Sequence, residues 1–157
     1  MIMDVTEIEV ERPKNNQKEY YSGKKKCHTM KVQVIIDALN KKIINFSLAK
    51  GSEHDFSIYK NNIELIDTNS ILIVDKGYTG IQKYHDKVLI PKRNYKKKSL
   101  TKNELLMNQF INKIRVRIEH VFGILKRYKI LSTCYRNHLQ RLDLRFCILS
   151  FVYNFQL

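Results

Sequence analysis

Three acidic residues stand where carboxylates could hold metal ions. Asp4 lies inside an apolar amino-terminal stretch, Asp75 directly follows the apolar residues 71–74, and Glu119 lies in a basic amphipathic segment. Hard divalent cations prefer oxygen ligands. Two Mg²⁺ ions about 3.5–4 Å apart can activate an attacking oxygen and stabilise a leaving oxygen in phosphodiester chemistry. Such a site needs carboxylates from distant points in the chain, and these three residues would supply them.

Each of these carboxylates also has an ordinary structural explanation, which the residues alone leave open. Asp75 could cap a turn, Asp4 could lie on a surface strand, and Glu119 could pair with Arg115 on a solvated helix. Two observations favour a functional site. Ligand-binding groups gather at the carboxyl ends of strands in open α/β sheets. In addition, Glu119 is the sole acid between residues 105 and 142, within a strongly basic segment.

The chain is strongly basic. Its 157 residues contain 29 Lys and Arg against 15 Asp and Glu, a formal net charge of +14. In a folded domain this charge favours a polyanionic partner, most simply nucleic acid. Charge alone does not separate a nuclease from a passive DNA binder. The hydrophobic content of 43% argues against disorder, and the length suits one domain.

Cysteine usage and the absence of long apolar runs predict a cytoplasmic protein, and a DNA partner would associate it with the nucleoid. No apolar run reaches the roughly 18 residues of a membrane-spanning helix. Asp4 follows Met1 too closely for a signal peptide. The three cysteines, Cys27, Cys134 and Cys147, are an odd number at wide spacing. They indicate reduced thiols, not a disulfide framework or a zinc site.

The elements that must position the acids follow from hydrophobic periodicity. Alternation predicts a first strand over residues 1–10, with a bulge or bend where its phase slips at Thr6-Glu7. The remaining expected elements are a hairpin of strands at 30–36 and 44–48, a helix at 55–66, short strands at 71–74 and 88–90, and helices at 103–128 and 138–154. This order predicts one domain, a mixed sheet with helical cover.

Four stretches run through nearly the whole chain and are specific when taken together: MDVTEIEVERPKNNQKEYYSGKKKCHTMKVQVIID, GSEHD, ILIVDKGYTG and RVRIEHVFGILKRYKIL. In these stretches the sequence resembles DDE transposases of the insertion-sequence type related to Harbinger elements. The resemblance implies an α/β, RNase H-like fold with a mixed five-stranded sheet flanked by helices. It implies that Asp4, Asp75 and Glu119 are the catalytic triad and bind two Mg²⁺ ions, which Mn²⁺ can replace. The implied activity is strand cleavage and strand transfer at transposon ends.

Three further residues match the family's motifs without an assigned metal role. His54 and Asp55 fall on an "HD" pair, and Asp55 is expected to cap the helix that follows. His120 follows the triad glutamate and could reach DNA or serve packing. In the loop after Asp75, Gly77 is expected to permit a tight turn. We treat His54, Asp55 and His120 as accessory candidates.

Two basic stretches suit contacts with double-stranded DNA, both transposon ends and target. Residues 24–26 are three consecutive lysines, and residues 87–102 hold seven Lys or Arg and no acid. Phosphate contacts position a protein on DNA without reading its sequence. The expected DNA-binding residues are Lys24, Lys25, Lys26, Lys92, Arg93, Lys96, Lys97, Lys98, Arg115, Arg117, Lys126 and Arg127.

Two departures from the family bear on activity. Three residues precede Asp4, and the family's amino-terminal helix-turn-helix region is missing. A truncated copy, one half of a split reading frame and a catalytic domain all fit, and truncation would leave Asp4 in a fraying terminus. The alternatives to a transposase catalytic domain are a non-catalytic DNA-binding remnant and a general RNase H-like nuclease. The apolar final helix should pack on the sheet or form a homo-oligomer interface.

Overall fold

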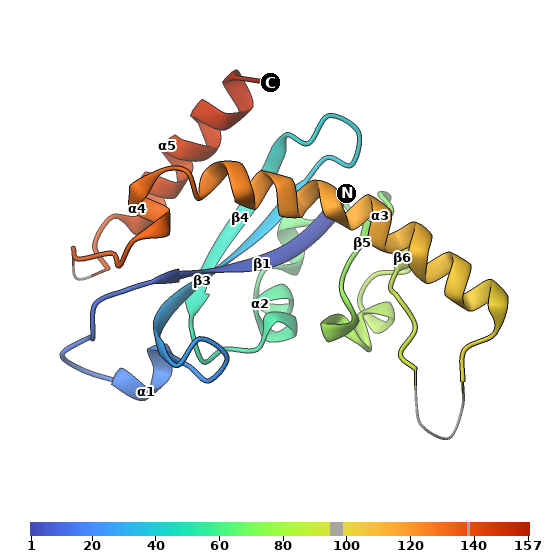
Figure 1. The fold of residues 1–157 in the computed structure, drawn as a ribbon, viewed down its shortest axis with the longest axis horizontal. Helices are drawn as coiled ribbons and strands as arrows, with labels where there is room; N and C mark the ends of the chain where they lie inside the picture. Colours follow the sequence, from blue (N-terminus) through green and yellow to red (C-terminus); the bar gives the residue numbers. More distant parts are fainter. Residues whose placement is uncertain (95–98, 138) are drawn as a thin grey trace.

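One mixed β-sheet organises the protein. The computed structural model describes residues 1–94, 99–137 and 139–157. The main strands are β1 (Ile2–Glu9), β3 (Cys27–Ile36), β4 (Ile43–Lys50), β5 (Leu72–Ile73) and β6 (Val88–Leu89). Strand β3 pairs antiparallel with β1 and β4, whereas β5 and β6 continue the sheet beyond β1 in parallel pairing. Figure 1 shows the order β4-β3-β1-β5-β6, which confirms the expected RNase H-like mixed sheet.

The polar excursion after the first strand contains structure that the sequence pattern did not predict. It forms the short helix α1 (Gln17–Tyr20) and a two-residue strand, β2 (Tyr21–Ser22), which pairs with the start of β3. The pairing joins Ser22 to Cys27, so the lysines between them lie in a tight connection. Elements this short carry too few residues for periodicity to reveal them.

Strand β1 is central and regular, so the expected bulge is wrong. Its register with β3 runs without interruption from Ile2↔Ile36 to Glu9↔Thr29. Ile2 and Met3 are fully buried, on opposite faces of the sheet. The apolar phase changes because Met3 packs into one core whereas Ile8 packs into the other. A strand buried on both faces loses simple alternation without any bulge.

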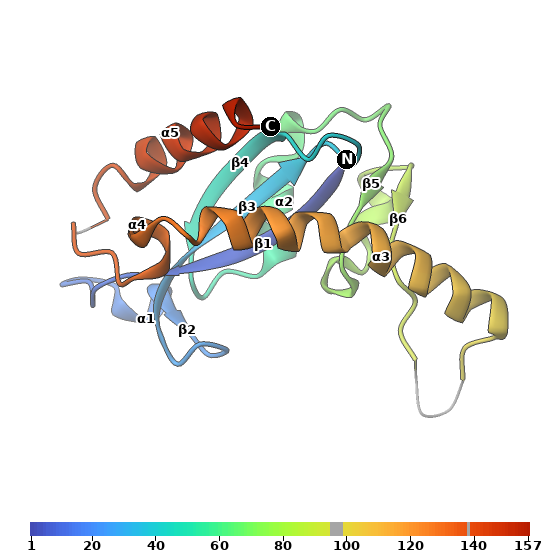
Figure 2. The same cartoon turned by 45° about the horizontal axis from the view of Figure 1, so that its top comes forward.

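Helices cover both faces of the sheet (Figure 2). On one face lie α3 (Lys102–Leu125), α4 (Lys129–Ser132) and α5 (Leu142–Phe155), and on the other lie α2 (Asp55–Asn61) and the 3₁₀ helices η1 (Ile63–Leu65), η2 (Lys76–Tyr78) and η3 (Ile81–Lys83). Helix α2 is shorter than expected because the Asn62 side chain donates to the Ile58 carbonyl oxygen at 2.7 Å, which ends regular helix.

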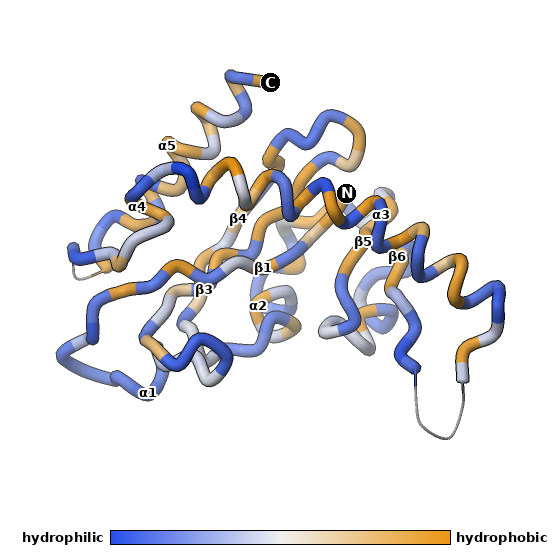
Figure 3. Tube along the Cα trace, in the orientation of Figure 1, coloured by the Kyte–Doolittle hydropathy of each residue, from blue (hydrophilic) through white to orange (hydrophobic). Residues whose placement is uncertain are grey.

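Helix α5 packs on the sheet through one side only. Phe146 is buried against Phe46 of β4, with ring centroids 4.8 Å apart. Asn154 donates to the carbonyl oxygen of Ile43 and accepts from its N–H, both at 2.8 Å. Figure 3 shows that α5 is predominantly apolar, and Phe151 on its other side is 71% exposed. Packing on the sheet is therefore confirmed, and a homo-oligomer contact through the exposed side stays a prediction.

The described residues contain no disulfide and no spanning helix. Cys27, Cys134 and Cys147 are all free thiols. Burial raises the pKa of Cys27 and that of Cys134, which favours the protonated thiol in both. In the part of the chain that the structure describes, no helix is both long and apolar enough to cross a membrane.

A capping box holds the start of α3, the helix that carries Glu119. The Thr101 hydroxyl oxygen accepts from the Glu104 N–H at 3.3 Å, and the Glu104 carboxylate accepts from the Thr101 N–H at 2.8 Å. The same carboxylate lies 2.8 Å from the Lys92 Nζ. The Lys92 contact, followed by those with Thr101, lowers the pKa of Glu104 to about 2.

Glu104→Gln should therefore destabilise the protein at neutral pH and have little effect in acid. A carboxylate with a depressed pKa contributes stability above its unfolded value of 4.5, and this contribution disappears as the pH falls toward 2. Urea unfolding should show that the difference in free energy of unfolding between wild type and variant shrinks from pH 7 to pH 3. Glu64→Gln in η1 is the control. A constant difference across this range would contradict the prediction.

Candidate active site

The parallel pairing of β1 and β5 brings two of the predicted acids together. Ile2 pairs with Ile73, so Asp4 and Asp75 each come two residues after a paired position. Side chains two residues apart on a strand share a face, and neighbouring strands lie about 4.8 Å apart. The register therefore places both carboxylates side by side, on the face of the sheet that α3 covers.

Arg115 of α3 joins the two carboxylates. Its Nη2 lies 2.9 Å from Asp4 Oδ2, and its Nη1 lies 3.2 Å from Asp75 Oδ1. The Arg115 side chain is only 13% exposed, so it lies against the sheet and not on the DNA-accessible surface expected from the sequence. Its Nε is buried and has no hydrogen-bond partner among the described residues. The guanidinium thus serves as the internal counter-charge of the acid pair.

Burial dominates the electrostatics of Asp4. Desolvation raises the pKa of Asp4, and the opposing attraction of Arg115 is the largest effect that lowers it. The Val5 N–H also donates to Asp4 Oδ1 at 2.8 Å. The neighbouring Asp75 adds to the upward shift of the Asp4 pKa because like charges repel. A cation placed between the two carboxylates relieves this repulsion.

Glu119 lies on α3 one turn beyond Arg115, and its side chain is exposed. Within residues 1–94, 99–137 and 139–157, no group of three Asp, Glu, His or Cys side chains could hold a metal ion. The structure thus brings Asp4 and Asp75 together but does not add Glu119 to them. Two adjacent carboxylates still fit a hard divalent cation, because both supply oxygen ligands and the repulsion between them favours a positive charge.

The loop after Asp75 begins with the 3₁₀ helix η2. The Tyr78 N–H donates to the Asp75 carbonyl oxygen at 3.1 Å, and Arg93 Nη2 donates to the Lys76 carbonyl oxygen at 2.9 Å. Gly80, with φ of 97°, is the glycine that this turn requires. Gly77, which the sequence suggested for that role, does not have a positive φ, and a Cβ there would meet nothing within 4 Å.

The accessory candidates His54, Asp55 and His120 lie outside the pair of Asp4 and Asp75. His54 is exposed and immediately precedes α2, with no side-chain cap at that helix. Asp55 is the first residue of α2, so its expected capping role is wrong, and its carboxylate instead pairs with Lys31 Nζ at 2.9 Å. His120 is exposed on α3. None of these three lies in the acid pair.

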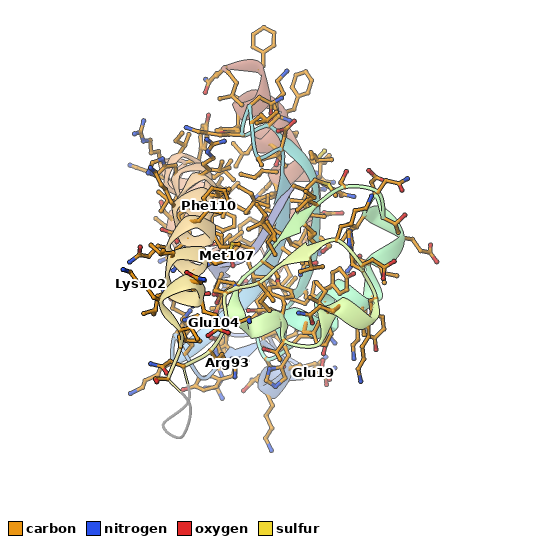
Figure 4. The ribbon with its side chains drawn as sticks, turned by 90° about the vertical axis from the view of Figure 1, so that its right-hand side faces the viewer. Glu19, Arg93, Lys102, Glu104, Met107 and Phe110 are labelled. Carbon is orange, nitrogen blue, oxygen red and sulfur yellow. The ribbon has the colours of Figure 1, made fainter. Side chains whose placement is uncertain are left out.

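Most of the expected DNA-binding residues are exposed on the described surface. Lys24, Lys25 and Lys26 are exposed in the connection between β2 and β3. Figure 4 shows Arg93, Lys102 and Glu104 around the start of α3. Lys92, Arg93, Lys126 and Arg127 are exposed, Arg117 is half-buried and donates to the Ala38 carbonyl oxygen, and Lys96, Lys97 and Lys98 lie outside the described residues.

Sequence reasoning missed the partners of the acids. It pairs Arg115 with Glu119 or assigns it to DNA, because helical spacing shows neighbours on a helix and not contacts with a sheet. An available signal for Gln33 was its position between the apolar residues Val32 and Val34 of β3.

The fold and the site together are an RNase H-like mixed sheet with a carboxylate pair at adjoining strands, facing a basic helix. Residues 3–154 match the family described as DDE superfamily endonuclease, and the chain belongs to this family. It is 39% identical over 157 residues to a protein named "Probable transposase for insertion sequence element IS702" from Microchaete diplosiphon. The match covers 100% of this chain and 57% of that relative. No solved structure matches the chain significantly.

Proposed function

We propose that this chain is the catalytic domain of an insertion-sequence transposase, which cleaves DNA strands at transposon ends and transfers them to target DNA. The observation that carries the proposal is the convergence of Asp4 and Asp75 from separate family motifs onto Arg115. The family membership and the likeness to a named transposase support the same reaction. The chain spans 57% of that relative's length. Transposition by the complete relative is therefore a proposal for this chain.

The proposed roles follow from position. Asp4 and Asp75 would hold a divalent metal ion, Mg²⁺ or Mn²⁺, with Glu119 approaching from α3 as the third ligand, and a second ion would complete the site. Bound there, the ions would activate the attacking oxygen and stabilise the leaving oxygen of the phosphodiester. Arg115 keeps the two carboxylates together, and the exposed lysines and arginines would bind the DNA phosphates.

The three lysines between β2 and β3 should contribute affinity without sequence preference. Replacing Lys24, Lys25 and Lys26 together with Gln should weaken binding equally to any duplex. The slope of log affinity against log salt should fall by about 1 for each DNA phosphate that a lysine no longer neutralises. Fluorescence anisotropy at several salt concentrations measures both the affinity for each duplex and this slope. A matched variant with Gln at Lys42, Lys60 and Lys83, exposed lysines outside both basic stretches, should change the slope less. Equal effects would contradict a specific role for residues 24–26.

A DNA cleavage assay tests the proposal. Duplexes carrying the element's inverted repeats, incubated with the chain and Mn²⁺, should be nicked at the repeat boundary to leave a free 3′-OH, whereas EDTA should prevent nicking. Nicking of unrelated duplexes to the same extent would favour a general RNase H-like nuclease and contradict the transposase assignment.

The second candidate is a non-catalytic DNA-binding transposase remnant. The observation that favours it is that Arg115 occupies the space between the acids while Glu119 stays outside the pair. This candidate predicts salt-sensitive DNA binding together with no metal-dependent cleavage in the same assay. That combination would overturn the catalytic proposal.

A further inference from the structure

Behind the Asp75 loop, on the face of the sheet opposite α3, a buried polar network joins three segments. Gln33 of β3 donates from Nε2 to Tyr78 Oη at 3.0 Å and to the Asp55 carbonyl oxygen at 3.3 Å. Gln33 is 2% exposed and Tyr78 is 1% exposed. Burying an amide and a phenol is costly unless both find partners. The hydrogen bonds of this network therefore offset the cost of burying the Gln33 amide and the Tyr78 hydroxyl.

The two hydrogen-bond partners of the Gln33 side chain determine which way its amide group faces. A backbone carbonyl can only accept, so the nitrogen of the Gln33 amide must face Asp55. Its two hydrogens are then shared between the Asp55 carbonyl and the Tyr78 hydroxyl oxygen. Burial raises the pKa of Tyr78 far above its ordinary value, so the phenol stays protonated. The link between Gln33 and Tyr78 is therefore a neutral hydrogen bond, without a charge to neutralise.

The other end of the network is anchored to the same strand. Lys31 of β3 lies 2.9 Å from the Asp55 carboxylate and also donates to the Glu53 carbonyl oxygen. Its side chain is 14% exposed. Two positions of β3, residues 31 and 33, thus hold the start of α2. Gln33 extends that rigid frame to Tyr78, whose N–H donates to the Asp75 carbonyl oxygen.

We propose that Gln33 and Tyr78 are positioning residues that hold the Asp75 carboxylate beside Asp4 for metal binding. Asp4 is fixed by its central strand, whereas Asp75 follows a two-residue strand and its side chain is 48% exposed. The place of Asp75 therefore depends on its loop, and Tyr78 is the buried anchor of that loop. This inference rests on the proposed function, because it takes the acid pair as a metal site.

The test is a titration of the full chain with Mn²⁺ alone, followed by electron paramagnetic resonance. Tyr78→Phe removes the hydroxyl, and Gln33→Met removes the amide at similar length. Each substitution should weaken Mn²⁺ binding by about 10-fold. This is the lower end of the loss in metal affinity seen when residues that orient metal ligands are replaced. The matched control is Tyr153→Phe, because Tyr153 is 2% exposed and donates one hydrogen bond, to the Lys41 carbonyl oxygen at 3.3 Å.

The outcomes separate this inference from the proposed function. A thermal stability loss shared by Tyr78→Phe and Tyr153→Phe supports positioning if Mn²⁺ binding is weaker in Tyr78→Phe and Gln33→Met but not in Tyr153→Phe. If Asp75→Ala abolishes Mn²⁺ binding while Tyr78→Phe and Gln33→Met bind as tightly as the Tyr153 control, the positioning role is wrong and the proposed function stands. If Asp75→Ala leaves Mn²⁺ binding unchanged, the metal site itself is wrong, and the positioning role with it.

Discussion

Asp75→Ala and Asp4→Ala should each lower Mn²⁺-dependent cleavage of transposon-end DNA by about 10³-fold or more, the scale seen when a member of a catalytic unit is removed. Each substitution removes one of the two adjacent carboxylates, so a divalent ion would lose one of its proposed oxygen ligands. The rate of nicking, measured on end-labelled duplexes under single-turnover conditions, checks this. Because neither residue contacts the lysines between β2 and β3, DNA affinity measured in EDTA should change much less.

The control for this prediction is Asp86→Ala, which removes an exposed aspartate away from the acid pair. Its cleavage rate should equal that of the wild type. Glu119→Gln tests the third proposed ligand separately, because this side chain does not join the pair in the structure. A loss comparable to Asp75→Ala would place Glu119 in the working site. Unchanged cleavage in Asp75→Ala would refute the acid pair as the catalytic centre.

Arg115→Met should have the largest effect on stability. It keeps a long side chain on α3 but leaves Asp4 desolvated without its counter-charge. Breaking a buried ion pair costs about 3–5 kcal/mol. Because Asp75 is 48% exposed and solvent screens it, we expect about 2 kcal/mol here. Urea unfolding at pH 7 measures the loss. Mn²⁺ should stabilise the variant more than the wild type, since a metal ion would then supply the missing positive charge.

Arg127→Met is the matched control, because Arg127 is an exposed arginine just beyond the end of α3. It should change the free energy of unfolding by less than about 0.5 kcal/mol. Combining Arg115→Met with Asp4→Asn should recover part of the stability, because the uncompensated charge is then gone. Equal losses in the Arg115 and Arg127 variants, or no recovery in the double variant, would contradict the role of Arg115 as counter-charge.

Much of the fold could be predicted from residue patterns. The long strands showed alternation, and the hairpin of β3 and β4 follows from two alternating runs with a polar turn between them. The long helix α3 showed its apolar stripe. Prediction failed where a residue's surroundings come from distant segments. The phase change in β1 suggested a bulge, yet it records burial of Met3 and Ile8 in two different cores.

The sequence by itself determined which residues could do chemistry, because Asp4, Asp75 and Glu119 stand in motifs whose types and spacing do not depend on the fold. Only the tertiary structure decided which of them meet. Parallel pairing of Ile2 with Ile73 sets Asp4 beside Asp75, and α3 brings Arg115, not Glu119, between them. The physical reason is that strand register and helix docking are long-range properties, set by the packing of both cores. No local pattern along the chain reports that β1 pairs with β5 or that α3 docks over both.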